Sequence, residues 1–302
     1  MSAKSNTIKS VMYALAANFS IAVAKAIAAV FTNSSAMLAE AIHSAADTGN
    51  QLLLLWGIKS AKKPPNEDFP LGFGKEIYFW SFIVAILLFS MGGLFSIYEG
   101  IHKIQHPGSL SYPWIALGVL GFAMIAEGLS FFGCVHEINK NRGDYSWWQW
   151  FRESRQSELI VVFGEDLAAL IGLILASSAI VLTMITGNPI YDAIGTLSIG
   201  LLLFFVAIMV GIEIKALLIG QGIDKRQKQK IEDFLNERKE IEQVYHLITL
   251  QMGKDVMVAI KAKMAPTGNE ESLIININNT EKALKQQFPQ ILWSFFEPDI
   301  TD

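Results

Sequence analysis

The sequence predicts an all-α membrane domain followed by a small α+β domain. Of its 302 residues, 52% are apolar and only 17% are charged, whereas soluble proteins average roughly a quarter charged residues. The charge is unevenly distributed, and the segment after residue 221 holds much of it. A membrane-spanning helix needs about 20 mostly apolar residues, and six apolar stretches are long enough. We therefore expect a six-helix transmembrane bundle in residues 1–221 and a cytoplasmic α+β domain in residues 222–302.

Polar or turn-forming segments separate the six apolar stretches. A polar turn follows the first stretch at 32–35, a Lys- and Pro-rich segment ends the second at 62–68, and Gly187-Asn188-Pro189 separates the fifth from the sixth. The predicted spans are 8–31, 36–58, 77–101, 112–135, 157–185 and 189–217.

Basic residues are concentrated in alternate loops, and this predicts the orientation in the membrane. The segment before span one, the loops after spans two and four, and the segment after span six are rich in Lys and Arg, while the loops between hold only Lys103. We expect both termini in the cytoplasm. Since the N-terminal stretch lacks a signal-peptide or transit-like pattern, we expect a bacterial-type plasma (inner) membrane. The net charge of −4 argues against nucleic-acid binding, and Cys134 alone cannot form an internal disulfide.

The loop 138–156 is rich in aromatic residues, with Trp147, Trp148 and Trp150 close together. Trp and Tyr favour the membrane interface, so we expect a short interfacial helix here. The alternative is a plain loop whose aromatic side chains pack on the tail.

The tail alternates between helical and strand patterns. Apolar residues at helical spacing predict helices over 225–239 and 270–287, and strands are expected over 244–252, 256–264 and 291–297. The order αββαβ is typical of a small two-layer α+β domain. Because such a domain is small for an independent core, dimerisation through it is plausible.

His43 and Asp47 lie four residues apart inside the second predicted span. Residues i and i+4 share one face of a helix, and ionisable groups inside a membrane usually belong to an ion or proton path. A His and an Asp on one face supply half of a tetrahedral metal site. The alternative is a polar contact between helices that holds no ion.

Glu165 and Asp166 lie near the start of the fifth span. With His43 and Asp47, Asp166 gives a dication three ligands. Neighbouring residues on a helix project about 100° apart, so Glu165 and Asp166 can hardly face one pocket without distortion. The fourth ligand could be Glu165, Asn18 or water.

Other charged residues also fall within the predicted spans. Glu99 and Glu213 lie near span ends, where interfacial solvation explains them. Glu127 is mid-span, and a helix-packing hydrogen bond or a proton path would account for it equally well. Asp192 follows Pro189 and could cap the sixth helix.

Four long segments show a family resemblance: 33–44, 75–82, 93–103 and 191–195. On these segments the chain resembles the cation diffusion facilitators, and within them the zinc-transporter-nine-like branch, along essentially its whole length. The resemblance implies a proton-coupled antiporter, a homodimer and a dication such as Zn²⁺ as transported substrate. It also implies a metallochaperone-like tail and a transport site with two ligands from each of spans two and five.

The sequence departs from the family at three places. Where the fifth span of the family commonly has a His four residues before its Asp, this chain has Val162, and Glu165 is the obvious substitute ligand. Phe69 and Phe73 replace two histidines of an accessory metal site, which we expect to be absent. The tail has only His246, with Phe295 at a position where the family often has a His.

The sequence therefore predicts a proton-coupled Zn²⁺ antiporter with His43, Asp47, Asp166 and Glu165 as metal ligands. Its expected partners are divalent cations, protons, the lipid membrane and a second copy of the chain, with no tightly bound cofactor. A transporter of Mn²⁺, Fe²⁺ or Co²⁺ is the first alternative, because losing a His makes the site richer in oxygen. A non-transporting metal sensor or scaffold is the second. An intramembrane metalloprotease is disfavoured, since the His-Glu-x-x-His signature is missing.

Overall fold

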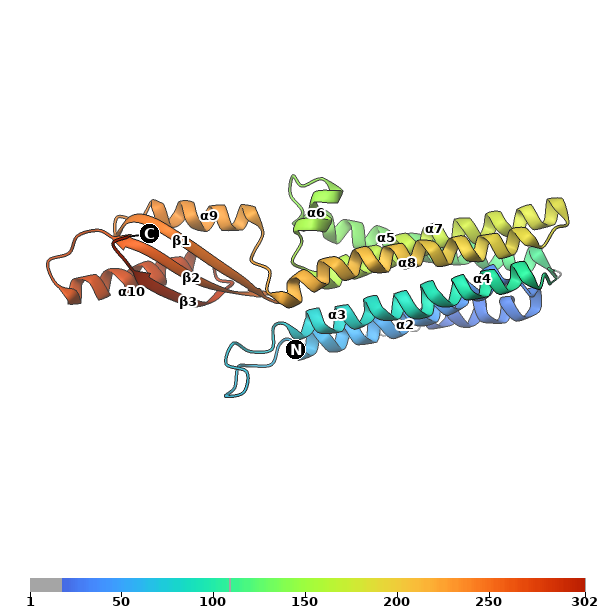
Figure 1. Cartoon of the computed structure of the whole chain (residues 1–302), viewed down its shortest axis with the longest axis horizontal. Coiled ribbons are helices and arrows are strands. Elements are labelled where there is room, and N and C mark those ends of the chain that lie inside the picture. Colours follow the sequence, from blue (N-terminus) through green and yellow to red (C-terminus); the bar gives the residue numbers. More distant parts are fainter. Residues whose placement is uncertain (1–17, 109, 302) are drawn as a thin grey trace, which may run out of the picture. The chain divides into compact units, whose positions relative to one another are not determined.

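The computed structural model describes residues 18–108 and 110–301 and divides the chain into two compact units (Figure 1). The first holds the described residues up to Gly57 together with Trp80–Asp144 and Glu158–Glu213. The second holds Ile58–Phe79, Tyr145–Ser157 and the chain from Ile214 onwards. Both units are therefore assembled from segments that are distant in sequence.

The first unit is a bundle of long helices. Among the residues that the structure describes, four helical segments are long and apolar enough to cross a membrane: Glu76–Gln105, Pro113–Asn141, Ser157–Thr186 and Ile190–Ile219. The helix Asn18–Thr32 is apolar but shorter within the described residues. The helix α2, Ser35–Ser60, has 26 residues and carries Glu40, Asp47 and Lys59. Residues 8–17 of the first predicted span, with Lys9, lie outside the described residues, as does Lys4.

The third predicted span, 77–101, is a chain of three helical segments. They are α3 (Glu76–Leu87), the π-helical η1 (Leu88–Leu94) and α4 (Phe95–Gln105). The later spans are α5 (Pro113–Asn141), α7 (Ser157–Thr186) and α8 (Ile190–Ile219).

Glycines bring η1 and α4 very close to α8. A Cβ atom added at Gly100 would lie 2.7 Å from the backbone nitrogen of Leu197, and one at Gly200 would lie 2.6 Å from that of Ile97. Small residues allow helix backbones in membranes to approach and gain packing contacts. These positions therefore tolerate no side chain without a shift of backbone.

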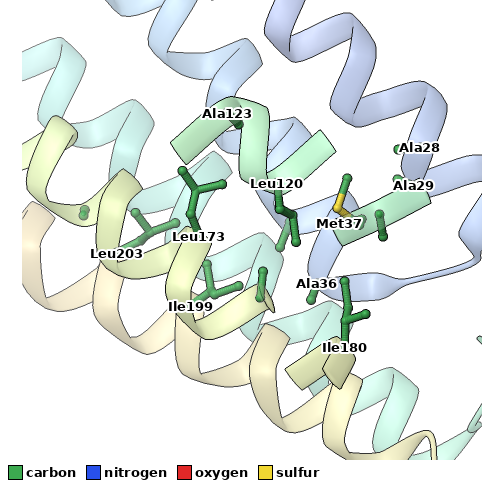
Figure 2. Packing of buried hydrophobic residues seen from close by; sticks show 14 of the residues in the cluster. Ala28, Ala29, Ala36, Met37, Leu120, Ala123, Leu173, Ile180, Ile199 and Leu203 are labelled. Atoms are coloured by element: carbon green, nitrogen blue, oxygen red, sulfur yellow. The ribbon is translucent and has the colours of Figure 1, made fainter. Parts of the chain in front are cut away.

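The core of the bundle lies where several helices meet (Figure 2). Met37 of α2, Leu120 of α5, Leu173 of α7 and Leu203 of α8 are almost completely buried there, between small alanines. Ala28 and Ala29 bring the helix Asn18–Thr32 into the same cluster. This packing fixes α2 beside α7, and both carry candidate site residues.

The C-terminal part of the second unit contains a three-stranded sheet and two helices. Its elements are α9 (Lys225–Asn236), β1 (Ile241–Met252), β2 (Asp255–Met264), α10 (Glu270–Gln287) and β3 (Ile291–Pro298). The strand order is β1-β2-β3, with β1 and β2 antiparallel and β2 and β3 parallel. Helix and strand side chains share one core, which includes Ile231, Leu247, Ile260 and Leu284.

The aromatic loop contains the short helix α6, Trp147–Glu153, so the predicted helix is present. Ser146 and Gln149 form a reciprocal capping box at its start. Trp150 and Phe151 are buried, whereas Trp148 is 60% exposed. The helix therefore presents aromatic side chains both to the protein and outward.

Ion and ring contacts hold the aromatic loop to the start of the tail. The guanidinium of Arg226 lies 3.6 Å from the ring centroid of Tyr145, and Arg155 Nε donates to the carbonyl of Gly222 at 2.7 Å. Lys225 Nζ lies 3.3 Å from a carboxylate oxygen of Glu153. Burial, with the nearby carboxylate of Asp224, raises the pKa of the Tyr145 phenol.

The segment 58–79 contacts the turn between β1 and β2. The Tyr78 hydroxyl accepts from the backbone N–H of Gly253 at 3.0 Å and donates to the carbonyl of the same residue at 3.3 Å. A Cβ atom at Gly74 would lie 2.1 Å from the carbonyl oxygen of Met252, so only glycine fits this approach. These contacts explain why the segment belongs to the second unit.

Candidate metal-binding site in the helical bundle

His43 and Asp47 lie on one face of α2, as their spacing predicts. His43 is 1% exposed and the Asp47 side chain 14%, and Nδ1 of His43 lies 3.5 Å from Oδ1 of Asp47. Both ring nitrogens of His43 and Oδ1 of Asp47 are buried without a hydrogen-bond partner. Buried polar atoms nearly always have partners, so these three atoms make this face of α2 the candidate binding site.

Glu165 of α7 contacts α2 through Asn50. The Nδ2 of Asn50 donates to Oε1 of Glu165 at 2.6 Å, and both side chains are buried. The remaining polar atom of Asn50, Oδ1, is buried and without a hydrogen-bond partner. Asn50 follows Asp47 by three residues and His43 by seven, so it shares their face of the helix.

Asp166 points to a different neighbour. One of its carboxylate oxygens accepts from the hydroxyl of Ser130 on α5 at 3.2 Å. Glu165 therefore contacts α2 and Asp166 contacts α5, as the roughly 100° turn between adjacent helical residues requires. In the described part of the chain, no group of three or more His, Cys, Asp or Glu residues is close enough to hold a metal.

The structure thus brings the four predicted ligands into one region as separate pairs. His43 meets Asp47, Glu165 meets Asn50 and Asp166 meets Ser130. Glu165, Asp166 and Glu127 nevertheless lie close enough to Asp47 to act on it electrostatically. Four carboxyl groups in an apolar surrounding repel one another unless cations or protons neutralise them.

Asn50 is the residue that sequence reasoning missed. Its position on the His43–Asp47 face was a usable signal, but an amide carries no charge and so drew no attention. The proposed alternative ligand Asn18 lies on the helix Asn18–Thr32 and is half-buried.

Asp192 does not cap its own helix. Its Oδ2 accepts from the backbone N–H of Ser35 at 2.7 Å and from the Ser35 hydroxyl at 2.9 Å, and its Oδ1 accepts from the Ser34 hydroxyl. The carboxylate of α8 therefore caps the start of α2, and Asn188 accepts from the backbone N–H of Ile190 at the start of α8. This contact places the helix that carries His43 and Asp47.

The positions where the sequence departs from the family lie as follows. Val162 is half-buried on α7. The rings of Phe69 and Phe73 lie 4.6 Å apart in the segment 58–79. On the sheet, His246 is exposed and Phe295 is 56% exposed.

Residues 11–219 match the model of the cation efflux transmembrane domain. The chain belongs to the cation efflux family. Within it, the chain is similar to the zinc-transporter-nine-like branch, as the resemblance implied. The relatives include a protein of Xenopus laevis named "Proton-coupled zinc antiporter SLC30A9, mitochondrial", 34% identical over 231 residues, which are 76% of this chain and 41% of that protein.

Two further relatives of this cation efflux protein show a similar degree of identity. The human protein of the same name is 32% identical over 81% of this chain and 44% of its own length. Metal tolerance protein C4 of Arabidopsis thaliana is 31% identical over 71% of this chain and 47% of its own length. The chain spans less than half the length of these relatives. It is a multi-pass membrane protein of the cation efflux family.

Proposed function

We propose that this protein exchanges Zn²⁺ for protons across a membrane and binds the cation between α2 and α7. The main support for the proposal is that three polar atoms of His43 and Asp47 are buried on one helix face without a hydrogen-bond partner. A bound cation would give such atoms the partner that buried polar atoms nearly always have. The relatives named as proton-coupled zinc antiporters support the choice of cation and of counter-ion.

The proposed ligands are His43, Asp47, Asp166 and Glu165. His43 and Asp47 lie on one face of α2, with Nδ1 of His43 3.5 Å from Oδ1 of Asp47. Glu165 reaches the shell by leaving the amide of Asn50, and Asp166 by leaving the hydroxyl of Ser130. Each of these exchanges replaces a hydrogen bond with a bond to a dication.

Protons compete with the metal for the same atoms. Carboxylates and imidazole bind a dication only when deprotonated, so protonation from the far side releases it. Alternating exposure of the site to the two sides then couples metal export to proton entry.

The same site could serve other dications. Val162 supplies no donor atom where the family commonly has a His, so the proposed shell holds one imidazole and three carboxylates. Mn²⁺ prefers oxygen-rich sites to nitrogen-rich ones, and the single imidazole is also a suitable ligand for Fe²⁺ and Co²⁺. Direct competition among these cations ranks them.

We also propose that the protein works as a homodimer, with residues 222–302 as the cytoplasmic dimerisation domain. Leu247, Ile260 and Phe296 lie in one row of the sheet and pack in the core. The adjacent row, Ile248, Ala259 and Phe295, points to the opposite face because side chains alternate. Ile248 is 63% exposed, and a second copy of the same row would cover it.

The basic loops support an orientation with both termini in the cytoplasm. We propose a bacterial-type plasma membrane, although four relatives are named as mitochondrial proteins. Protease digestion of a C-terminal tag tests the orientation. If the C-terminus is cytoplasmic, the tag should be cleaved in inverted vesicles and protected in intact spheroplasts.

The function is tested in vesicles that contain a zinc-sensitive dye and carry a pH gradient. The wild-type protein should give zinc flux with opposite proton flux, and Asp47→Asn should give neither. Glu137→Gln is the matched control, because this exposed carboxylate lies near the end of α5 and pairs with Lys140. Full flux in Asp47→Asn would remove Asp47 from the site, and no flux in the wild-type protein at any gradient would refute the function.

A further inference from the structure

A second buried charge cluster lies one to two turns from the proposed metal ligands on α2. Lys25 of the helix Asn18–Thr32 and Glu40 of α2 are both 0% exposed, and Lys25 Nζ lies 3.1 Å from Glu40 Oε2. The same nitrogen donates to the hydroxyl of Ser44 at 2.7 Å. Residues 40 and 44 are one turn apart, so the ammonium lies beside α2 between them.

The ammonium lies on the side of Glu40 that faces the metal ligands. Ser44 follows His43 directly and precedes Asp47 by less than one turn. Glu40 instead turns its second oxygen, Oε1, towards α7, where a Cβ atom at Gly172 would lie 2.4 Å from it. That oxygen is buried without a hydrogen-bond partner. Of the two charges, the ammonium and not the carboxylate acts electrostatically on His43 and Asp47.

Lys25 acts electrostatically on both proposed α2 ligands. It is close enough to His43 and to Asp47 to influence each of them, and it also acts on Glu127. In a medium of low dielectric constant, such an interaction is much stronger than in water. A fixed positive charge therefore lies beside a site proposed to bind a dication.

Stability alone does not explain why the Lys25–Glu40 ion pair is buried in the bundle. Removing charges from water costs so much that well-packed apolar residues often stabilise a protein more than a buried pair does. Membrane helices in particular seldom carry ionisable residues outside ion paths. Lys25 and Glu40 form such a buried pair of ionisable residues on membrane helices, and neither is one of the proposed metal ligands.

We infer that Lys25 is a built-in counter-charge of the transport site. When the site is empty, the ammonium offsets part of the negative charge of the surrounding carboxylates. When a dication is bound, the same ammonium repels it, weakens its binding and favours its release. Glu40 and Ser44 are positioning residues, because they fix the ammonium on the ligand side of α2.

The inference rests on the proposed function, and it predicts effects of opposite sign. Lys25→Met removes the positive charge and should tighten zinc binding, on the order of tenfold for a unit charge in a partly shielded site. Glu40→Gln removes the negative charge but keeps the ammonium, so it should weaken binding. The double variant Lys25→Met/Glu40→Gln removes both charges and should bind more tightly than the wild type.

The experiment measures zinc dissociation constants by equilibrium binding to the full chain in nanodiscs, together with zinc flux in vesicles. Tighter binding with slower flux in the double variant supports the counter-charge. Lys25→Arg keeps the charge and should restore the wild-type dissociation constant if it is tolerated. A purely structural role would weaken binding in every variant, and that result overturns the inference.

The double variant keeps the test open if Lys25→Met alone fails to fold, because it leaves no buried charge without a partner. Unchanged zinc affinity in a folded double variant also overturns the inference. If the wild-type protein itself neither binds nor transports zinc, the proposed function fails instead. The two failures are therefore distinguishable.

Discussion

The amide of Asn50 on α2 donates a hydrogen bond of 2.6 Å to the carboxylate of Glu165 on α7. These residues are 115 positions apart, and both are buried. The bond links the two helices that carry the proposed ligands. We expect cation binding to exchange this bond for a metal–carboxylate bond.

Asn50→Leu should therefore destabilise the protein when zinc is absent. The change leaves Glu165 buried without its donor, which typically costs about 1–3 kcal/mol. Thermal unfolding in detergent, with and without zinc, measures the effect. Zinc should recover more stability in the variant than in the wild type, because it gives Glu165 a new partner.

Glu165→Gln provides the comparison for this experiment. An amide at position 165 can still bond Asn50, so most of the stability should remain while zinc affinity falls. If zinc affinity is unchanged in Glu165→Gln, Glu165 is not a ligand.

Asp192→Ala should loosen the start of α2. The carboxylate accepts from two hydroxyls and one backbone N–H there, and their loss leaves buried donors without partners. We expect a loss of about 2–4 kcal/mol, measured by thermal unfolding. Ser198→Ala is the control on the same helix, since its exposed hydroxyl bonds only the carbonyl of Ile194. Equal stabilities of the two variants would contradict the capping role.

Tyr78→Phe should release the segment 58–79 from the turn at Gly253. The phenol makes both a donor and an acceptor bond to Gly253, and phenylalanine makes neither. Amide hydrogen exchange at Gly253 should accelerate, and proteolysis within 61–75 should increase. Lys254→Ala, in the exposed part of the same turn, should change neither. Unaltered exchange in Tyr78→Phe would show that the contact does not hold the segment.

Charged residues on the exposed sheet row should dissociate the proposed dimer. Ile248 and Phe295 both lie in the row that includes Ala259, and Asp at both positions would have to be desolvated in an interface. Analytical ultracentrifugation of the full chain in detergent should show a shift from dimer to monomer. The tail fold should persist, because neither side chain belongs to its core. A dimer that survives both changes must use another surface.

Local patterns predicted the tail helices and strands well. Asn269 accepts from the backbone N–H of Ser272, so a cap marks the start of α10, which spans the predicted residues 270–287. The helix from Lys225 ends at Asn236 rather than at 239, and Arg238 pairs with Glu240 in the turn that leads into β1. Helix ends depend on such local contacts, which spacing alone does not reveal.

Contacts between residues far apart in the chain could not be predicted from the sequence. The spacing of His43 and Asp47 is a local signal, and it predicted their common face. The contacts of Asn50 with Glu165 and of Asp192 with Ser35 join residues more than 100 positions apart. Nothing in the periodicity of either helix specifies which neighbour it meets, so these contacts needed the folded chain.

The glycines between η1–α4 and α8 have a consequence for lipids. A Cβ atom added at Gly93, Gly100 or Gly200 would lie 2.6–3.1 Å from a backbone atom of the facing helix. An acyl chain is wider than this space, so a lipid tail does not fit between the helices at these positions. An opening for the cation at these positions would require the two backbones to separate.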